Sequence, residues 1–300
     1  MKINHNILAI IACLLWGSAF YAGKICLAYL NPIFLAVIRL FFASLILLFF
    51  IKSNPIKVFL KDPINIIKLS LLKSALTFLL FNFGLNLVNG STGAIIIGLS
   101  PVVSMLLATI FIPDDKLSSR KIFGMILGIL AIVLLTINTN YEEQDGKNQI
   151  FGVLLLVLNI LCVGYGDIIT KKRFKSFYMP DINFIQNTIG CLILFIIAVT
   201  FKKTEFNLVL ERPTILIWIL WLSIITSVSV SLWFEIVNRE HVKLTDISMW
   251  KLLIPLVGAI SNWILVKQDK PTVFSVLALF GIMISILVSL KYAEDDRRSV

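Results

Sequence analysis

The stretch "LSPVVSMLLATIFIPDDK" at residues 99–116 returns in altered form as "LIPLVGAISNWILVKQDK" at residues 253–270. A constant offset of 154 positions aligns the prolines Pro101 and Pro255 and the closing Asp-Lys pairs. Proline removes a backbone donor and breaks the regular hydrogen bonding of a helix. The same apolar, proline-broken segment therefore occurs once in each half of the chain, which indicates an internal repeat.

The composition places the chain in a membrane. Of its 300 residues, 58% are hydrophobic and only 15% are charged. A soluble domain of this length needs more polar surface, so an integral membrane protein is expected. Apolar runs of about 17 to 23 residues recur along the chain, the length that a helix needs to cross the hydrocarbon core. Because the alternation typical of barrel strands is absent, the spans are expected to be helices.

Ten apolar runs are expected to span the membrane, and they divide into two groups of five. The runs are 7–27, 33–51, 69–88, 92–112, 122–138, 149–170, 182–201, 214–236, 247–266 and 272–290. The acidic connection at 138–149 separates the groups, which assigns residues 1–140 to a first repeat and 141–300 to a second. Because five is odd, the second repeat enters the membrane the opposite way up. The predicted fold is all-α, with two inverted five-helix repeats around a central cavity, a design typical of secondary transporters.

The distribution of lysine and arginine predicts the orientation. Connections on the side of the N-terminus carry 17 of these residues, and those on the opposite side carry 6. Cytoplasmic loops are enriched in basic residues, so both termini are expected in the cytoplasm of a multi-pass protein of the cytoplasmic (inner) membrane. The first run continues to about residue 30, longer than a signal peptide's apolar region, so we expect it to be retained.

Several chemistries are excluded by what the chain lacks. Its four cysteines have no CxxC spacing, its two histidines lie outside the runs, and no HExxH, GxSxG or ATP-binding loop occurs. We therefore expect no metal, no cofactor and no enzymatic activity. The net charge of +10 is spread over the loops, which argues against nucleic acid as a partner. A membrane-embedded enzyme and a receptor or scaffold stay open as alternatives to a transporter.

Several segments resemble the EamA family of the drug/metabolite transporter superfamily. They are "WGSAFYAGK" at 16–24, "LAVIRLFFASLILL" at 35–48, and the proline-centred runs that end in "DDKLS" and "QDKPT". The resemblance extends over about residues 7–290. It implies ten helices in two inverted repeats around a cavity, and export of amino acids and other small metabolites. The family usually has Gly-Glu where this chain has Asp114-Asp115 and Gln268-Asp269, a change that we expect to affect helix capping more than transport.

Charged side chains within the runs are the first candidates for a binding site, because a charge in lipid costs at least a few kcal/mol. Arg39 lies six residues into the second run, about 9 Å from its end. Lys251 precedes Pro255 by one turn, where the proline frees a backbone carbonyl. Trp16 lies near the middle of the first run. We predict that these three residues bind substrate; the alternatives are interior packing for Trp16 and reach to the interface for the cations.

Five further residues are predicted to bind substrate: Tyr21, Asn82, Asn86, Asn187 and Trp250. Tyr21 shares a small and polar stripe of the first run, and the third run carries two of the asparagines one turn apart. Asn187 aligns with Arg39 in the repeat. The alternative for the amides is hydrogen bonding between packed helices.

Lys24, Asp167 and Glu235 are candidates for gating or proton coupling. Lys24 lies near the outer end of the first run, where its side chain can also reach the interface. Asp167 precedes Lys171 by one turn, and Glu235 precedes Arg239 by the same spacing. Ion pairs on one helix face are the simpler interpretation of both spacings.

The candidate groups favour a secondary carrier of a small solute. Two cations, several amides and few acids suit an amphoteric or anionic solute with a carboxylate, such as an amino acid. The chain has no acidic residue before Asp62, whereas related antiporters of lipophilic cations use one in the first helix. A cargo similar to S-adenosylmethionine, or a cationic drug-like compound, stays open through Asp167. The expected partners are the solute and the lipid bilayer, with the protein as a monomer or homodimer.

Overall fold

A computed structural model of the chain gives the fold. The structure describes residues 4–113, 115, 146–205 and 211–265, and the isolated positions 122–123, 126–127, 129–130, 209, 271, 273, 276–277, 280–281 and 284. Within these ranges the secondary structure is helical, without a strand. The expected runs 122–138 and 272–290 lie largely outside the described residues, so the count of ten helices stays a prediction.

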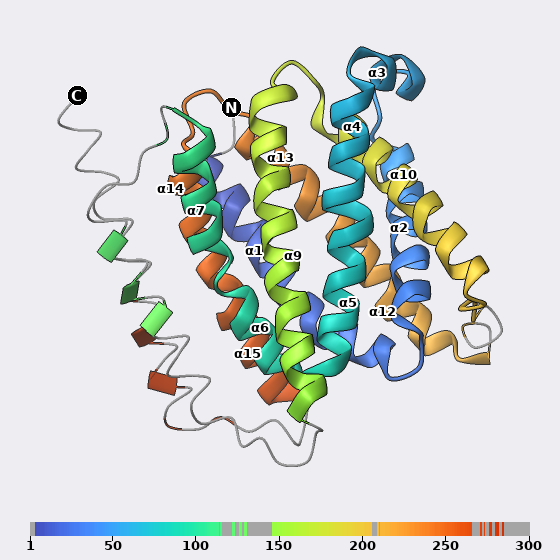
Figure 1. The fold of residues 1–300 in the computed structure, drawn as a ribbon, viewed down its shortest axis with the longest axis vertical. Coiled ribbons are helices and arrows are strands. Elements are labelled where there is room, and N and C mark those ends of the chain that lie inside the picture. Colours follow the sequence, from blue (N-terminus) through green and yellow to red (C-terminus); the bar gives the residue numbers. More distant parts are fainter. Residues whose placement is uncertain are drawn as a thin grey trace.

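The helices follow the expected apolar runs (Figure 1). They are α1 (His5–Leu27), α2 (Pro32–Leu48), α3 (Pro55–Lys61), α4 (Pro63–Leu69), η1 (Ser70–Leu76), α5 (Thr77–Leu87), α6 (Gly90–Ile97), α7 (Ser100–Phe111), α9 (Gly146–Arg173), α10 (Met179–Thr200), α12 (Pro213–Ile224), η2 (Ile225–Ser229), α13 (Val230–Val237), α14 (Leu244–Ser248), η3 (Met249–Leu252) and α15 (Leu253–Leu265). In the described part, seven continuous helical runs are long and apolar enough to cross a membrane, and α2 is shorter with 17 residues. The protein is therefore an all-α membrane protein.

Local sequence signals set where the helices begin. Proline occupies the first turn of α2, α3, α4 and α12, a position where its missing N–H costs nothing. Asn31 and Asn54 precede the first two of these helices, and their side chains accept hydrogen bonds from the backbone N–H groups of Ile33 and Ile56. These caps satisfy donors that the helix itself leaves open.

Two kinds of irregularity recur in corresponding helices of the two halves. The helix α4–η1–α5 contains a π-helical segment, and so does α12–η2–α13. The next helix in each half is also irregular: α6 ends before α7 begins at Ser100, and a 3-10 turn, η3, separates α14 from α15. Pro101 and Pro255 each lie within the first three residues after the irregular point, consistent with the effect of proline on helical hydrogen bonds.

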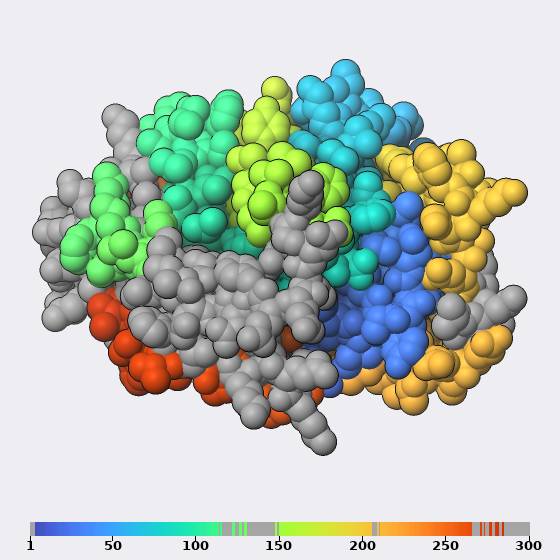
Figure 2. Space-filling model, turned by 60° about the horizontal axis from the view of Figure 1, so that its bottom comes forward, coloured from blue at the N-terminus to red at the C-terminus, as the bar shows by residue number. Residues whose placement is uncertain are grey.

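Helices from the two halves are interleaved in the bundle. In Figure 1, α9 runs beside α5 and α7, although it belongs to the second half of the sequence. Figure 2 shows the same neighbours with side chains, yellow-green α9 lying between green α7 and cyan α4. The helix α10 packs on α2, and α1 packs on α15. Every such pairing joins the first half to the second, so neither half encloses the centre of the bundle alone.

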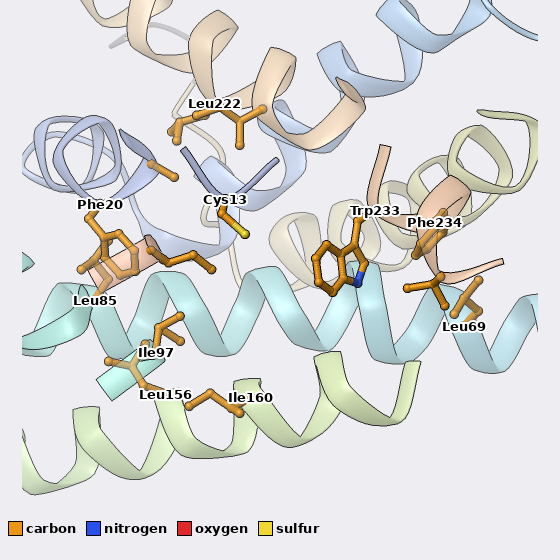
Figure 3. Packing of buried hydrophobic residues seen from close by; sticks show 14 of the residues in the cluster. Cys13, Phe20, Leu69, Leu85, Ile97, Leu156, Ile160, Leu222, Trp233 and Phe234 are labelled. Carbon is orange, nitrogen blue, oxygen red and sulfur yellow. The ribbon is translucent and has the colours of Figure 1, made fainter. Parts of the chain in front are cut away.

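The apolar core joins these helices and reaches the centre of the bundle. Figure 3 shows part of it, with Phe20, Ile97, Ile160, Trp233 and Phe234 among the buried residues. They come from α1, α6, α9 and α13. The core therefore fixes the relative positions of the helices that carry the polar groups described below.

Close packing of α1 on α15 depends on Gly17. A Cβ atom added at Gly17 would lie 2.4 Å from the Cβ of Val257. At Gly23, on the same helix, an added Cβ would meet only the end of the Leu85 side chain, at 2.9 Å. Small residues at such crossings let two helices approach closely.

Gly17→Ala is therefore expected to lower the free energy of unfolding by about 1–3 kcal/mol, the usual cost of overpacking. Gly23→Ala is the matched control and is expected to have a much smaller effect, because the Leu85 side chain can move. Thermal unfolding of both variants in detergent, monitored by circular dichroism, measures the difference. Equal melting temperatures would show that α1 and α15 can move apart without loss of stability.

Candidate functional site

A cavity of about 130 Å³ lies at the centre of the bundle. Its polar lining residues are Arg39, Lys73, Thr77, Ser100, Asn159, Thr226 and Lys251, and its aromatic ones are Trp16, Phe20, Phe78 and Phe81. They come from both halves of the chain. No group of three His, Cys, Asp or Glu side chains that could hold a metal occurs in the described ranges.

The irregular helical segments supply most of the polar lining. Lys73 comes from η1, Thr226 from η2 and Lys251 from η3, and Ser100 begins α7 directly after the break. A π-helical or 3-10 turn changes the angle at which side chains leave the helix, and π segments often lie at functional sites. The departures from regular helix thus direct polar groups into an otherwise apolar interior.

Arg39 is buried, with 4% of its surface exposed. Its Nε donates a hydrogen bond of 2.7 Å to the Oγ1 of Thr226, and its guanidinium lies over the Phe78 ring at 4.5 Å. These two contacts fix the plane of the guanidinium. Its two terminal nitrogens form no hydrogen bond or ion pair with any residue that the structure describes. Arg39 therefore presents unused donors at the cavity wall.

Asp167 lies between two lysines in the interior. Its Oδ1 accepts from the Nζ of Lys73, and its Oδ2 accepts from the Nζ of Lys251 at 3.0 Å. Lys251 also donates to the Oγ of Ser104 at 2.8 Å. Asp167 is fully buried, and the two lysines are 8% and 2% exposed. A buried charge is tolerated only when it is paired and hydrogen-bonded, so this Lys-Asp-Lys cluster is a single structural unit.

Two consecutive aromatic residues of α13 cover the lysines of this cluster. The Nζ of Lys251 lies 4.7 Å from the centre of the Trp233 ring, and the Nζ of Lys73 lies 4.6 Å from that of Phe234. Figure 3 shows both rings within the apolar core. Cation–π contacts of this kind stabilise a positive charge away from water. The cluster and Arg39 together give the cavity two more positive charges than negative ones.

The structure corrects the predicted pair of Asp167 and Lys171. Lys171 instead donates to the backbone carbonyls of Arg239 and Val242, at 2.9 and 2.6 Å. Helical spacing allowed the local pair, but Asp167 faces the interior, where its partners come from other helices. The simpler interpretation does hold for Glu235, which is exposed and forms a 4.0 Å pair with Arg239.

Lys24 does not line the cavity, and its side chain is partly exposed. Its Nζ donates to the carbonyls of Leu85 and Val88, at 3.0 and 2.8 Å, where α5 ends. A cation at this position satisfies carbonyl groups that the helix leaves open. None of the three candidates for gating or proton coupling thus places a free carboxylate in the cavity, and their roles in transport stay predictions.

Three of the eight predicted substrate-binding residues, Trp16, Arg39 and Lys251, line the cavity. The other five lie outside its lining. Tyr21 packs against Trp218 with ring centres 5.4 Å apart. Trp250 donates to Asn6 at 3.2 Å, and Asn86 is exposed.

The two remaining asparagines bind neighbouring helices, as the alternative interpretation of the amides expects. Asn82 donates to the carbonyl of Pro32 at 3.1 Å, and Asn187 accepts from Ser74 at 3.0 Å. A direct part in substrate binding stays a prediction for all five residues outside the lining.

Lys73, Asn159 and Thr226 line the cavity although the sequence did not single them out for binding. Lys73 lies close to one end of its expected run, a position from which a lysine side chain can reach the membrane interface. The available signal for Lys73 was the presence of two lysines and one aspartate, Asp167, within the apolar runs, because buried charges of opposite sign attract each other. Nothing in their local sequence marks Asn159 or Thr226.

Comparison with known proteins agrees with this architecture. The model of the EamA-like transporter family matches residues 4–137 and 150–291. The chain belongs to this family. It is also similar to a protein named uncharacterized transporter YcxC of Bacillus subtilis (strain 168), with 24% identity over 143 residues, which are 48% of this chain and 45% of that protein. The match thus spans less than half of the relative's length.

A solved crystal structure shares the fold of this transporter. It has 13% sequence identity, a TM-score of 0.73, and a match that covers 98% of this chain and 99% of the other. At that identity the likeness shows the fold alone.

Asp167→Asn is expected to destabilise the transporter by about 3–5 kcal/mol, because it leaves two buried lysines without a counter-charge. In a Lys73→Met background the same substitution is expected to cost less, since only Lys251 is then stranded. Lys171→Met provides the control background, in which the full cost is expected. Thermal unfolding in detergent measures the cycle, and equal costs in both backgrounds would contradict the pairing of Lys73 with Asp167.

Proposed function

We propose that this protein is a secondary carrier that moves a small solute with a carboxylate group across the cytoplasmic membrane by alternating access. The cavity is its binding site, and the solute is an amino acid or a similar amphoteric or anionic compound. The observation that carries the proposal is the free end of Arg39 at the wall of the cavity.

Arg39 is suited to a carboxylate in both geometry and surroundings. A guanidinium binds a carboxylate through two parallel N–H···O bonds. Thr226 takes the Nε donor and Phe78 covers one face, so the two terminal nitrogens are the part left for a ligand. Apolar walls strengthen such an interaction, since little water competes with it. The cavity of about 130 Å³ favours a small solute, because an engineered cavity of about 150 Å³ holds benzene.

Alternating access is supported by matching roles in the two halves. Lys24 and Lys171 align in the sequence repeat. Lys24 binds carbonyls at the end of α5, and Lys171 binds carbonyls of the turn that follows α13. Arg39 and Asn187 also align. Arg39 bonds a threonine of η2, and Asn187 bonds a serine of η1.

These parallels favour two inverted five-helix repeats, about 1–140 and 141–300, and the two stretches that the family model matches fall within them. The excess of basic residues in the connections on one side supports cytoplasmic termini.

A cationic cargo suits this cavity less well. Both oxygens of Asp167 already accept from lysines. The rings of Phe78, Trp233 and Phe234 are covered by the cations of the protein itself. Neither a carboxylate nor these aromatic faces are therefore free for a compound similar to S-adenosylmethionine.

Counterflow in proteoliposomes tests the proposal, with labelled amino acids, other small carboxylates and organic cations as the panel. Arg39→Ala is expected to reduce transport of the carried solute at least tenfold, because the carboxylate loses a bidentate, charge-assisted partner worth about 1.5–3 kcal/mol. Thr226→Val keeps the charge but frees the guanidinium, so an intermediate loss is expected. Arg239→Ala, at the surface, is the control. Normal transport by Arg39→Ala would contradict the assigned role.

A further inference from the structure

The ten expected membrane runs contain very few acidic residues. Only Asp167 and Glu235 fall within them, and the runs 122–138 and 272–290 contain none. Glu235 is exposed and pairs with Arg239. Asp167 has both oxygens bound to lysines. The lining of the cavity therefore offers no carboxylate to a positively charged group on a solute, because Asp181 of α10, buried with a free Oδ2, lies outside it.

The cavity also has an excess of cations. Arg39, Lys73 and Lys251 all line it, and only the Asp167 charge opposes them. An ammonium group that enters this space loses its hydration, which costs several kcal/mol when no counter-charge replaces it. It also meets three charges of its own sign. An amino acid would gain binding free energy at its carboxylate and lose binding free energy at its ammonium group.

Neutral acceptors and donors line the cavity, although no free carboxylate is there to balance the charge of an ammonium group. Asn159 donates its amide N–H to the carbonyl of Thr77 at 2.7 Å, which leaves the amide oxygen for another group. The buried Oγ of Ser100 has no hydrogen-bond partner among the described residues. Both side chains line the cavity. A solute hydroxyl can donate to the amide oxygen of Asn159, and a keto oxygen can accept from the hydroxyl of Ser100, in each case without bringing a charge.

We propose that the site selects small carboxylic acids with a hydroxyl or keto group over amino acids with the same carbon skeleton. This inference rests on the proposed carrier function and narrows its substrate class. Arg39 binds the carboxylate, the excess positive charge favours a solute with a net negative charge, and Asn159 and Ser100 bind the neutral oxygen. A solute of about six non-hydrogen atoms, the number in benzene, matches the volume of the cavity.

L-Lactate and L-alanine form the matched pair for the test, since they differ only by a hydroxyl in place of an ammonium group. In counterflow with wild-type proteoliposomes, lactate is expected to move at least tenfold faster than alanine, and unlabelled pyruvate is expected to inhibit lactate flux. Alanine flux equal to or above that of lactate would overturn the selectivity while leaving the carrier function in place. Absence of flux for every solute in the panel would overturn both proposals.

Asn159→Asp tests the cause of the selectivity. It places a carboxylate in the lining at almost unchanged volume, so the ratio of lactate to alanine flux is expected to fall at least tenfold. Asn262→Asp, at a buried amide outside the lining, is the control and is expected to keep the wild-type ratio. Size-exclusion chromatography confirms that each variant is folded before reconstitution. An unchanged ratio in folded Asn159→Asp would contradict the electrostatic origin of the selectivity. Whether the selectivity exists is decided by the lactate and alanine fluxes of the wild-type protein.

Discussion

The buried cluster of Lys73, Asp167 and Lys251 is the constraint on which the centre of this transporter depends. Asp167 bonds to residues 94 and 84 positions away in the sequence, so it joins η1, α9 and η3 at one point. Three charges removed from water are stable only in this mutual arrangement. The cluster therefore holds two irregular segments against a regular helix, and the polar wall of the cavity follows from that contact.

The two halves share a scaffold but differ in the residues that face the centre. Lys24 and Lys171 have equivalent structural roles at helix ends, and both halves carry a π-helical segment in the corresponding helix. Where the first half has Arg39 at the cavity, the second has Asn187, which bonds Ser74 instead. The shared framework follows from the sequence repeat, and the polar site follows from residues that differ between the two halves. A symmetric pair of arginines would bring further like charge into the same apolar space, at a high electrostatic cost.

The sequence could predict the helices because apolar length and basic loops are local properties. It also identified Arg39 and Lys251, whose depth in their runs was informative. It could not pair Asp167 correctly, because spacing within one helix says nothing of partners on two other helices. The sequence did not predict the π-helical segments, for a different reason. The sequences of η1 and η2 fit the pattern of an apolar helix, and only the packed structure shows the altered direction of Lys73 and Thr226. Asn86 lies outside the cavity lining, which the sequence could not show, because helical phase alone does not tell which face meets lipid or solvent.

Aromatic rings stabilise the cations at the centre of the bundle. Phe78, Phe234 and Trp233 each cover one face of a cation and replace water there. A cation stabilised by a ring needs fewer carboxylate partners, which is how the protein can keep three cations inside with a single acid. Phe78 covers one face of the Arg39 guanidinium and Thr226 takes its Nε donor, so the two terminal nitrogens are the part left for a ligand. Polar residues in place of these rings would admit water, and water would weaken the two hydrogen bonds proposed between Arg39 and a carboxylate.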